Sequence, residues 1–294
     1  MASELIWEGD GPPSLHRPIL VVALSGLFDV SKVATNALRH LVATRMVETI
    51  AHIDPDGFYD FTQERPDVWL DEYGDRQLSW PSNEIHAVRY PNGPHDLVTL
   101  VGVEPHIRWK TFAGLLLDVG RQCQCEVIVT VGAGAEAVPH TRTPAVVGST
   151  TNEDLASRLG LSRPQYQGPT GVFGVLHQMV ERTRLPAISL RVPVPHYLVN
   201  AEHPKSTAAL LRHLEHVLGV PTGHGALDEE IARWSELHET AVGDDAQASA
   251  FVRLLEREHD RRVEAAIPTA DDLAEEFERF LREQRPGDPD DRGI

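Results

Sequence analysis

The stretch Glu126–Thr150 limits most strongly what this chain can fold into. It begins with the continuous apolar run Val127–Val131, which is typical of a buried central strand. Four small residues, 132–135, follow, and then come the polar segment Pro139–Pro144 and a second short apolar run, Ala145–Val147. In open α/β sheets, ligands lie in the crevice beyond the carboxyl ends of the strands. We therefore expect a binding site to follow this strand.

Strand and helix patterns alternate along the chain up to about residue 222, which predicts a mixed sheet in a three-layer α/β/α domain. Strands are expected at Pro18–Ser25, Val47–Ile53, Asp96–Val103, Val127–Val131, Ala145–Val147 and Pro186–Val192. Apolar stripes at helical spacing lie in 30–42, 108–123, 173–184 and 204–218, and a short helix is expected in 151–160. The segment 18–53 has the order of a right-handed β-α-β unit.

The sequence pattern divides the chain into four parts. Residues 1–16 form an N-terminal arm, and 17–222 form the core domain. Within that core, 58–90 reads as a β-hairpin or meander inserted at a sheet edge, because short strand-like segments alternate with turn residues. Residues 223–285 carry three amphipathic stripes, the third starting at Thr269, and predict an all-helical appendage. The Pro-, Gly- and Asp-rich residues 286–294 read as a disordered tail.

The charge distribution argues against two classes of partner. The formal net charge is −17, and the stretch from Asp228 to the end holds 20 acidic and 9 basic residues. Nucleic acids and anionic membranes are bound by cationic patches, so we expect neither as a partner. The sequence has no secretory signal and no apolar run long enough to span a membrane, which predicts a cytoplasmic protein. The cysteines, Cys123 and Cys125, are expected to be buried thiols and not metal ligands.

Six short blocks, in order over residues 17–220, resemble the conserved blocks of one family. They are Ser25-Gly-Leu-Phe-Asp29, Asp54-x-Asp-x-Phe58-Tyr-Asp60, Gly102-Val-Glu104-Pro105 followed by Trp109 and Phe112, His140-Thr-Arg142-x-Pro144, Gly168-Pro-Thr-Gly171 and Val194-Pro-His-Tyr197. Together they resemble the proteasome-assembly-chaperone family, in its second-chaperone branch and its actinobacterial form. No single block is specific, but six blocks in register are.

This resemblance implies a phosphorylase/hydrolase-like α/β/α fold. It also implies a small homo-oligomer, for which we expect a trimer, and binding to proteasome α subunits. Relatives often dock through a C-terminal hydrophobic-Tyr-any tripeptide. The present sequence departs from that pattern, because it ends in Asp291-Arg-Gly-Ile294 without a tyrosine. The helical appendage is also foreign to the chaperones.

The polar loops predict a candidate ligand cleft. An imidazole, a hydroxyl and a guanidinium follow one another at residues 140–142 and could bind phosphate or carboxylate. Backbone N–H groups at 168–171 could serve the same anion, and Asp29 and Glu104 could act as a base or a ribose ligand. The candidate residues are Gly26, Asp29, Glu104, Gly132, Gly134, His140, Thr141, Arg142, Gly168, Thr170, Gly171, His196 and Tyr197. Alternatively, Arg142 pairs with Glu104 or Asp29 and the loops brace one another or a subunit interface.

Established catalytic motifs are absent from the sequence. Gly132-x-Gly134-x-x-Ala137 superficially matches a dinucleotide fingerprint, but Pro139 and Pro144 disfavour the helix that this fingerprint requires. No serine, cysteine or lysine stands in an activating motif, and we expect no metal or cofactor. The favoured hypothesis is therefore a non-enzymatic, homo-oligomeric assembly protein. The alternative is a nucleoside-phosphorylase-like enzyme or amide hydrolase that uses Asp29, Glu104, His140 and Arg142. An open pocket around these four residues would favour the enzyme.

Overall fold

The computed structural model of the 294-residue chain describes residues 4–43 and 45–266. The chain divides into two compact units, with the boundary between Ala241 and Val242. The first unit holds the sheet with its covering helices and most of helix α6. The second unit is represented among the described residues by helix α7.

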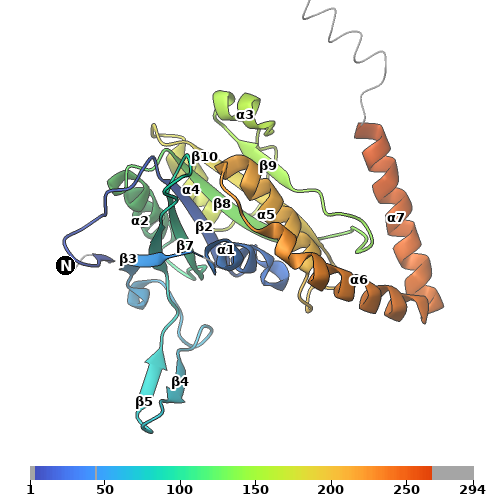
Figure 1. Cartoon of the computed structure of the whole chain (residues 1–294), viewed down its shortest axis with the longest axis horizontal. Coiled ribbons are helices and arrows are strands. Elements are labelled where there is room, and N and C mark those ends of the chain that lie inside the picture. Colours follow the sequence, from blue (N-terminus) through green and yellow to red (C-terminus); the bar gives the residue numbers. More distant parts are fainter. Residues whose placement is uncertain (1–3, 44, 267–294) are drawn as a thin grey trace, which may run out of the picture. The chain divides into compact units, whose positions relative to one another are not determined.

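The first unit is built on a mixed eight-stranded sheet with the order β1-β3-β6-β7-β2-β8-β10-β9 in the described part of the chain (Figure 1). The pairs β7–β2, β2–β8 and β8–β10 are parallel, and the remaining pairs are antiparallel. The strands span β1 Leu5–Trp7, β2 Ile19–Ser25, β3 Val47–Ile53, β6 Glu84–Val88, β7 Leu97–Val103, β8 Val127–Glu136, β9 Val147–Thr150 and β10 Ala187–Pro195. The predicted mixed sheet is confirmed.

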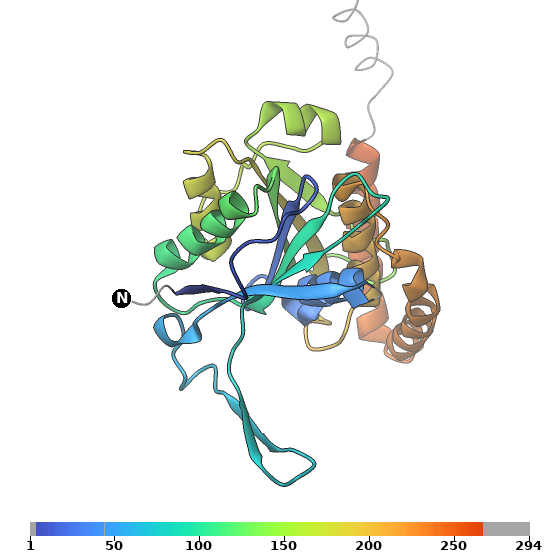
Figure 2. The same ribbon diagram turned by 60° about the vertical axis from the view of Figure 1, so that its left-hand side comes forward.

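Helices cover both faces of this sheet, as the three-layer prediction required (Figure 2). Helices α1 and α5 pack together on one face, and α2 and α4 on the other. Alternate residues of β2 point to opposite faces, so Leu20 and Val22 join the core under α2 while Val21 and Ala23 join the core under α1. The helices span α1 Val33–Ala43, α2 Trp109–Gln122, α3 Glu153–Leu159, α4 Val172–Val180 and α5 Pro204–Leu218, with 3₁₀ turns η1 Val30–Lys32, η2 Pro55–Gly57 and η3 His224–Leu227.

The inserted segment differs from its prediction in one respect. Strands β4 (Asp67–Leu70) and β5 (Arg76–Ser79) form a separate two-stranded hairpin, as expected. The third strand of the expected edge meander, β6, lies inside the main sheet between β3 and β7. The expectation of an edge position was therefore wrong for β6, whose Ile85, Ala87 and Val88 are fully buried. The N-terminal arm also takes part in the sheet, because β1 pairs with β3 at the edge.

Several element ends follow the sequence signals, and the end of β8 does not. Pro204 begins α5, and Gly219 ends it in the left-handed conformation, as predicted. The short helix expected in 151–160 is α3, which is capped by Asn152, whose Oδ1 accepts a hydrogen bond from Leu155 N (2.9 Å). Strand β8 does not end at Val131 but runs on to Glu136, where its extension pairs with β10.

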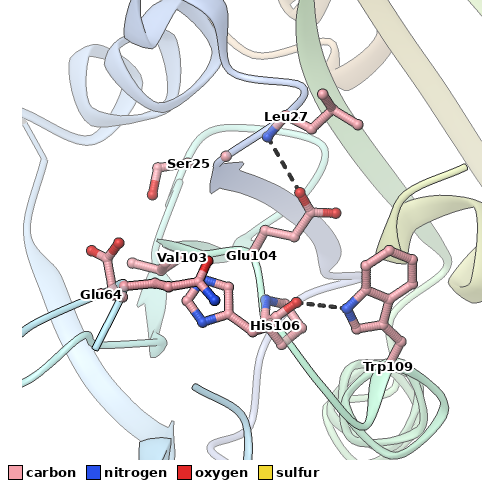
Figure 3. Close-up of a pocket in the computed structure, with 10 residues that line it drawn as sticks. Ser25, Leu27, Glu64, Val103, Glu104, His106 and Trp109 are labelled. Atoms are coloured by element: carbon pink, nitrogen blue, oxygen red, sulfur yellow. Dashed lines mark hydrogen bonds between the residues drawn. The ribbon is translucent and has the colours of Figure 1, made fainter. Parts of the chain in front are cut away.

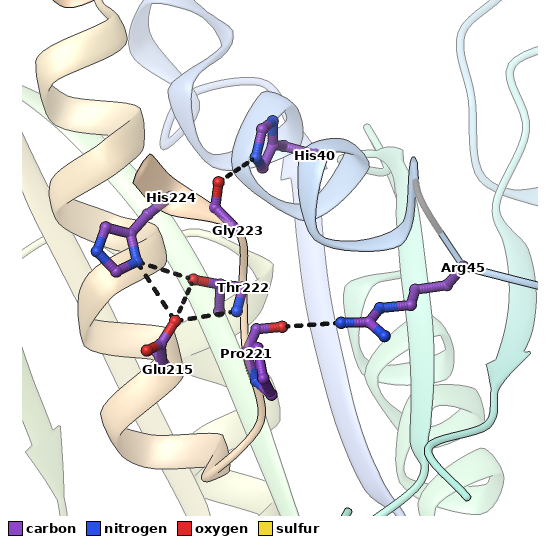
Figure 4. A network of polar contacts seen from close by, with 7 residues as sticks. All are labelled: His40, Arg45, Glu215, Pro221, Thr222, Gly223 and His224. Atoms are coloured by element: carbon purple, nitrogen blue, oxygen red, sulfur yellow. Dashed lines mark hydrogen bonds and ion pairs between the residues drawn. The ribbon is translucent and has the colours of Figure 1, made fainter. Parts of the chain in front are cut away.

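A polar network fixes the chain where it leaves α5 for the helical region (Figure 4). One oxygen of Glu215 accepts hydrogen bonds from Thr222 N and Thr222 Oγ1, both at 3.0 Å, and lies 3.3 Å from His224 Nδ1. His40 and Arg45, at the end of α1 and just beyond it, contact the carbonyl oxygens of residues 223 and 221. The connection is therefore held against α1 and α5.

Helix α6 spans Asp228–Gly243 and helix α7 spans Ala246–Ala266. Asp245 caps α7, since its Oδ1 accepts hydrogen bonds from Gln247 N (2.8 Å) and Ala248 N (3.0 Å). The third predicted helix, from Thr269, and the predicted tail 286–294 lie outside the described residues. Among the helices that are described, none combines the length and apolarity needed to cross a bilayer.

Candidate functional site

Glu104 joins three segments at the carboxyl edge of the sheet. It follows the end of β7, and its Oε2 accepts a hydrogen bond from Leu27 N (3.3 Å) in the loop after β2 (Figure 3). Its Oε1 accepts a second hydrogen bond from Val172 N (3.0 Å), at the first residue of α4. A carboxylate is favoured at a helix N-terminus, where the backbone N–H groups have no partner within the helix. Glu104 therefore braces these segments.

Two of the predicted glycines make room for this carboxylate. Gly26 has φ +142°, and a Cβ built on it would lie 2.9 Å from Glu104 Cβ. A Cβ on Gly171 would lie 2.6 Å from Glu104 Oε1. These distances are shorter than normal contacts with a Cβ atom, and the positive φ of Gly26 adds a second reason for glycine at that position. Gly26, Glu104 and Gly171 therefore pack as one unit. This arrangement fits the alternative hypothesis that the loops brace one another.

We expect Gly26→Ala to lower the free energy of unfolding by about 2–3 kcal/mol, because the substitution adds a Cβ where the backbone conformation and Glu104 both exclude it. Gly134→Ala is the matched control: a Cβ built there meets nothing within 4 Å. Denaturant unfolding of the two variants checks this. Equal stabilities would show that the close approach to Glu104 is not significant.

Asp29 serves helix α1 and does not line the cleft described below. Its Oδ1 accepts hydrogen bonds from Ala34 N (2.8 Å) and Thr35 N (3.1 Å), and its Oδ2 accepts one from Thr35 Oγ1 (2.6 Å). The side chain is buried, and burial raises the pKa of Asp29 although the hydrogen bonds from Thr35 oppose that shift. Both carboxylate oxygens are therefore occupied within the fold. Neither Asp29 nor Glu104 pairs with Arg142, so that predicted ion pair is not formed.

His140 is buried against a second group of residues. Tyr197 Oη accepts a hydrogen bond from His140 N (2.9 Å) and lies 2.8 Å from His140 Nδ1. Lys205 Nζ donates to the His140 carbonyl oxygen at 2.9 Å. Thr141 and Arg142 continue the same loop and are half-buried. The structure thus brings the candidate residues His140 and Tyr197 together, while His196 bonds the carbonyl oxygen of Glu136.

Trp234 of α6 lies among buried histidines near this loop. Its ring stacks on His238 with the centroids 4.1 Å apart, and it meets His203 edge-on at 4.5 Å. The indole Nε1 donates to the Glu202 carbonyl oxygen at 2.8 Å. We call Trp234, His203, His238 and His140 the Trp234 cluster. The sequence pattern placed Trp234 on the inward stripe of its helix, but no local signal identified the histidine neighbours.

The remaining predicted glycines do not form an anion cradle. Gly132 and Gly134 lie within β8, and a Cβ on Gly132 would lie 3.2 Å from the Phe28 carbonyl oxygen. The predicted role of Gly132 in close packing therefore fits the structure. Gly168 has φ +148°, and Thr170 is exposed.

A cleft of about 570 Å³ opens at the carboxyl ends of β2 and β7 (Figure 3). Gly26 and Glu104 line it, whereas Asp29, His140 and Arg142 do not. The four residues of the enzyme hypothesis therefore do not converge here. Of the predicted candidates only Gly26 and Glu104 line the cleft, and Gln63 and Glu64 reach it from the inserted region, where no candidate was expected. The lining residues are Ser25, Gly26, Leu27, Gln63, Glu64, Val103, Glu104, Pro105, His106 and Trp109.

The β4–β5 hairpin carries the most concentrated exposed apolar surface of the insertion. In its ladder Val68 stands opposite Leu78, and Leu70 lies two residues from Val68 on the same side. We call these three side chains the hairpin face. Their exposed fractions are 52% for Val68, 50% for Leu78 and 65% for Leu70. Trp80 ties the base of the hairpin to Phe61, with ring centroids 5.0 Å apart. The hairpin extends away from the main sheet in both views (Figures 1 and 2).

The comparisons with known proteins identify the family. The model of the PAC2 family matches residues 23–242, and the chain belongs to this family. A PAC2 family protein from Streptomyces avermitilis is 36% identical, with TM-score 0.73, over 80% of this chain and 99% of its own. A proteasome-assembly chaperone homologue from Mycobacterium tuberculosis is 32% identical, with TM-score 0.72, over 80% and 99%.

A more distant structure shares the fold. The archaeal proteasome activator PbaB from Pyrococcus furiosus is 20% identical, with TM-score 0.60, over 81% of this chain and 98% of its own. The comparison with curated proteins gave no match. The resemblance stated from the six sequence blocks is therefore confirmed at the level of the family and the fold.

Proposed function

We propose that this protein is a non-enzymatic assembly chaperone that binds proteasome α subunits through the hairpin face. The observation that carries the proposal is the hairpin itself, which presents large apolar side chains away from the core. The M. tuberculosis relative is a proteasome-assembly chaperone homologue, which supports a proteasome-related partner, and the choice of α subunits belongs to the proposal. The predicted homo-oligomer, its trimeric state and its cytoplasmic location belong to the same proposal.

The hairpin has the physical character of a docking element. A two-stranded ribbon is only marginally stable in water unless a third strand or a helix covers its apolar face. Here β4 and β5 pair only with each other among the described strands, so their outer edges and the hairpin face are open. A partner surface that covers Val68, Leu70 and Leu78 would bury apolar area and could extend the ribbon by strand addition.

The charge of the hairpin restricts the partner surface. Residues 67–80 contain four carboxylates and one guanidinium. Asp71 keeps its charge, because hydrogen bonds from the Gln77 side chain and from backbone N–H groups lower its pKa. We therefore propose that the hairpin binds a surface of the α subunit that has an apolar centre and a rim of lysine or arginine. A second copy of this chain, whose net charge is also −17, is the less favourable occupant.

The triple variant Val68→Ser, Leu70→Ser and Leu78→Ser tests this assignment. We expect it to reduce capture of proteasome α subunits from the native host by at least about tenfold, since the apolar centre of an interface carries most of its binding energy. Val147→Ser is the control, because it removes a 60% exposed side chain from β9 at the far edge of the sheet. Quantitative mass spectrometry of the captured proteins gives the measurement.

A second variant separates loss of binding from loss of hairpin structure. Glu72→Lys reverses one exposed charge at the hairpin tip and leaves the apolar face intact. If the partner has a basic rim, this variant should weaken capture several-fold, and more strongly at low salt. Full capture by both the triple variant and Glu72→Lys would exclude the hairpin as the docking element.

A further inference from the structure

The cleft at Glu104 lies at a topological switch point of the sheet. Strand β2 leads into α1 on one face of the sheet, whereas its parallel neighbour β7 leads into α2 on the other face. The two connections therefore leave in opposite directions and open a crevice between the strand ends. In open α/β sheets this is the place where small ligands bind. A volume of about 570 Å³ falls within the range of small-molecule sites.

The charge of the lining is entirely negative. Glu64 and Glu104 supply two carboxylates, and the lining contains no lysine or arginine. Neither carboxylate forms an ion pair with a basic side chain in the described part of the chain. Glu104 is held in place by two backbone N–H groups, so its position does not depend on a ligand. A cation bound in the cleft would be attracted by both carboxylates.

The uncharged part of the lining adds a second requirement. Trp109 and Leu27 provide apolar surface, and the Trp109 indole N–H is already used by the Pro105 carbonyl oxygen at 2.6 Å. His106 Nδ1 accepts a hydrogen bond from Asp60 N (3.0 Å), which leaves Nε2 as the donor of the neutral ring. An aromatic wall beside carboxylates suits an organic cation with an apolar body. Phosphate, nucleotides and carboxylates would face uncompensated repulsion.

We propose that this cleft binds a small organic amine, with its ammonium group between Glu64 and Glu104 and its apolar body against Trp109. This assignment is independent of the hairpin face, since it concerns a different surface of the same unit. It also differs from a phosphorylase site, which would require cationic groups for phosphate. Because Gln63 and Glu64 belong to the inserted segment, the insertion supplies one wall of the site.

Three probes of one shape test the charge requirement on the purified full-length protein. Benzylamine is a cation at pH 7, benzyl alcohol is neutral and benzoate is an anion. Ligand-observed saturation-transfer NMR should show saturable binding of benzylamine with a dissociation constant on the order of 1 mM, which corresponds to about −4 kcal/mol. Benzoate should give no saturable signal. The proposal would be overturned if benzoate bound as well as benzylamine. It would also be overturned if benzylamine showed no binding up to about 10 mM, tenfold the expected dissociation constant.

Glu64→Gln is the diagnostic variant, because the Glu64 side chain forms no hydrogen bond or ion pair with the residues that the structure describes. We expect this variant to weaken the binding of benzylamine at least fivefold and to leave the binding of benzyl alcohol unchanged. Glu181→Gln, an exposed position at the end of α4 and outside the cleft lining, is the matched control and should bind as the native protein does. If both variants weakened benzylamine binding equally, or if neither weakened it, the cleft would be rejected as the site.

Discussion

Trp234→Ala is expected to lower the free energy of unfolding of the first unit by about 3–5 kcal/mol, the range for truncating a buried tryptophan. Trp234 is only 9% exposed and is the one residue of α6 that is buried in the described structure. Its loss removes the stacking on His238, the edge contact with His203 and the hydrogen bond to the Glu202 carbonyl oxygen. Helix α6 would then lose its main anchor.

Two variants separate packing from other effects of removing a tryptophan. Trp234→Phe keeps an aromatic ring but loses the indole hydrogen bond, so we expect a cost of about 1 kcal/mol. Trp69→Ala removes a tryptophan that is 51% exposed on the hairpin, and it should change stability by less than about 0.5 kcal/mol. Denaturant unfolding measures the global effect, and hydrogen exchange of α6 detects local undocking. An unchanged Trp234→Ala protein in both measurements would contradict the anchoring role.

Stability is expected to fall steeply as the pH drops from 7 to 5, because two histidines are held neutral in the folded protein. The pKa of His203 is lowered to about 4, chiefly by burial and further by Lys205, His238 and His140. The pKa of His177 is lowered to about 4, chiefly by burial and also by Arg191. Below about pH 6.5 the unfolded chain binds protons that the folded chain does not, so folding loses free energy as the pH falls toward 4.

The size of this effect follows from the difference between the pKa of each histidine in the folded protein and its pKa in the unfolded chain. Each histidine should remove about 2 kcal/mol of stability between pH 6.5 and pH 5, at about 1.36 kcal/mol per pH unit. His203→Asn removes the titrating group, and it can keep the cap of α5, where His203 Nδ1 now accepts a hydrogen bond from Ser206 N. Its pH profile should be flatter by about that amount. His216→Asn, at an exposed position of the same helix, should keep the native slope. Parallel profiles for all three proteins would be inconsistent with a neutral, buried His203.

The sheet could be predicted from the sequence because burial on both faces gives continuous apolar runs. Pro18–Ser25, which is buried along almost its whole length, reappears as β2 with nearly the same bounds. Strand β6 was harder to place, because Glu84–Val88 is short and mixes polar with apolar residues. Its position between β3 and β7 depends on contacts with strands far away in the sequence. Those contacts leave no local pattern.

The candidate site was predicted less well, for a physical reason. The order of strands indicates which loops share an edge of the sheet, but not which way each side chain points. Asp29 turns into the start of α1, and Glu104 turns toward Leu27 N and Val172 N. His140 is buried beside Tyr197 on the side of α5. Backbone N–H groups thus occupy the carboxylates that the sequence suggested as catalytic groups.

These positions bear on the choice between the two functional hypotheses. An enzyme that used Asp29, Glu104, His140 and Arg142 would need them around one substrate, and the cleft contains one of the four. A docking protein needs a stable body and an exposed apolar element. The braced loop ends and the hairpin face meet that requirement.

Equilibrium titration of the purified full-length protein with purified proteasome α subunits of its host tests the central proposal most directly. The proposal predicts a complex at micromolar concentrations or below for the native protein and for Val147→Ser. It also predicts binding at least about tenfold weaker for the hairpin triple variant. No complex with the native protein at micromolar concentrations would contradict the chaperone function. Equal affinities for all three proteins would retain the partner and reject the hairpin face as its docking surface.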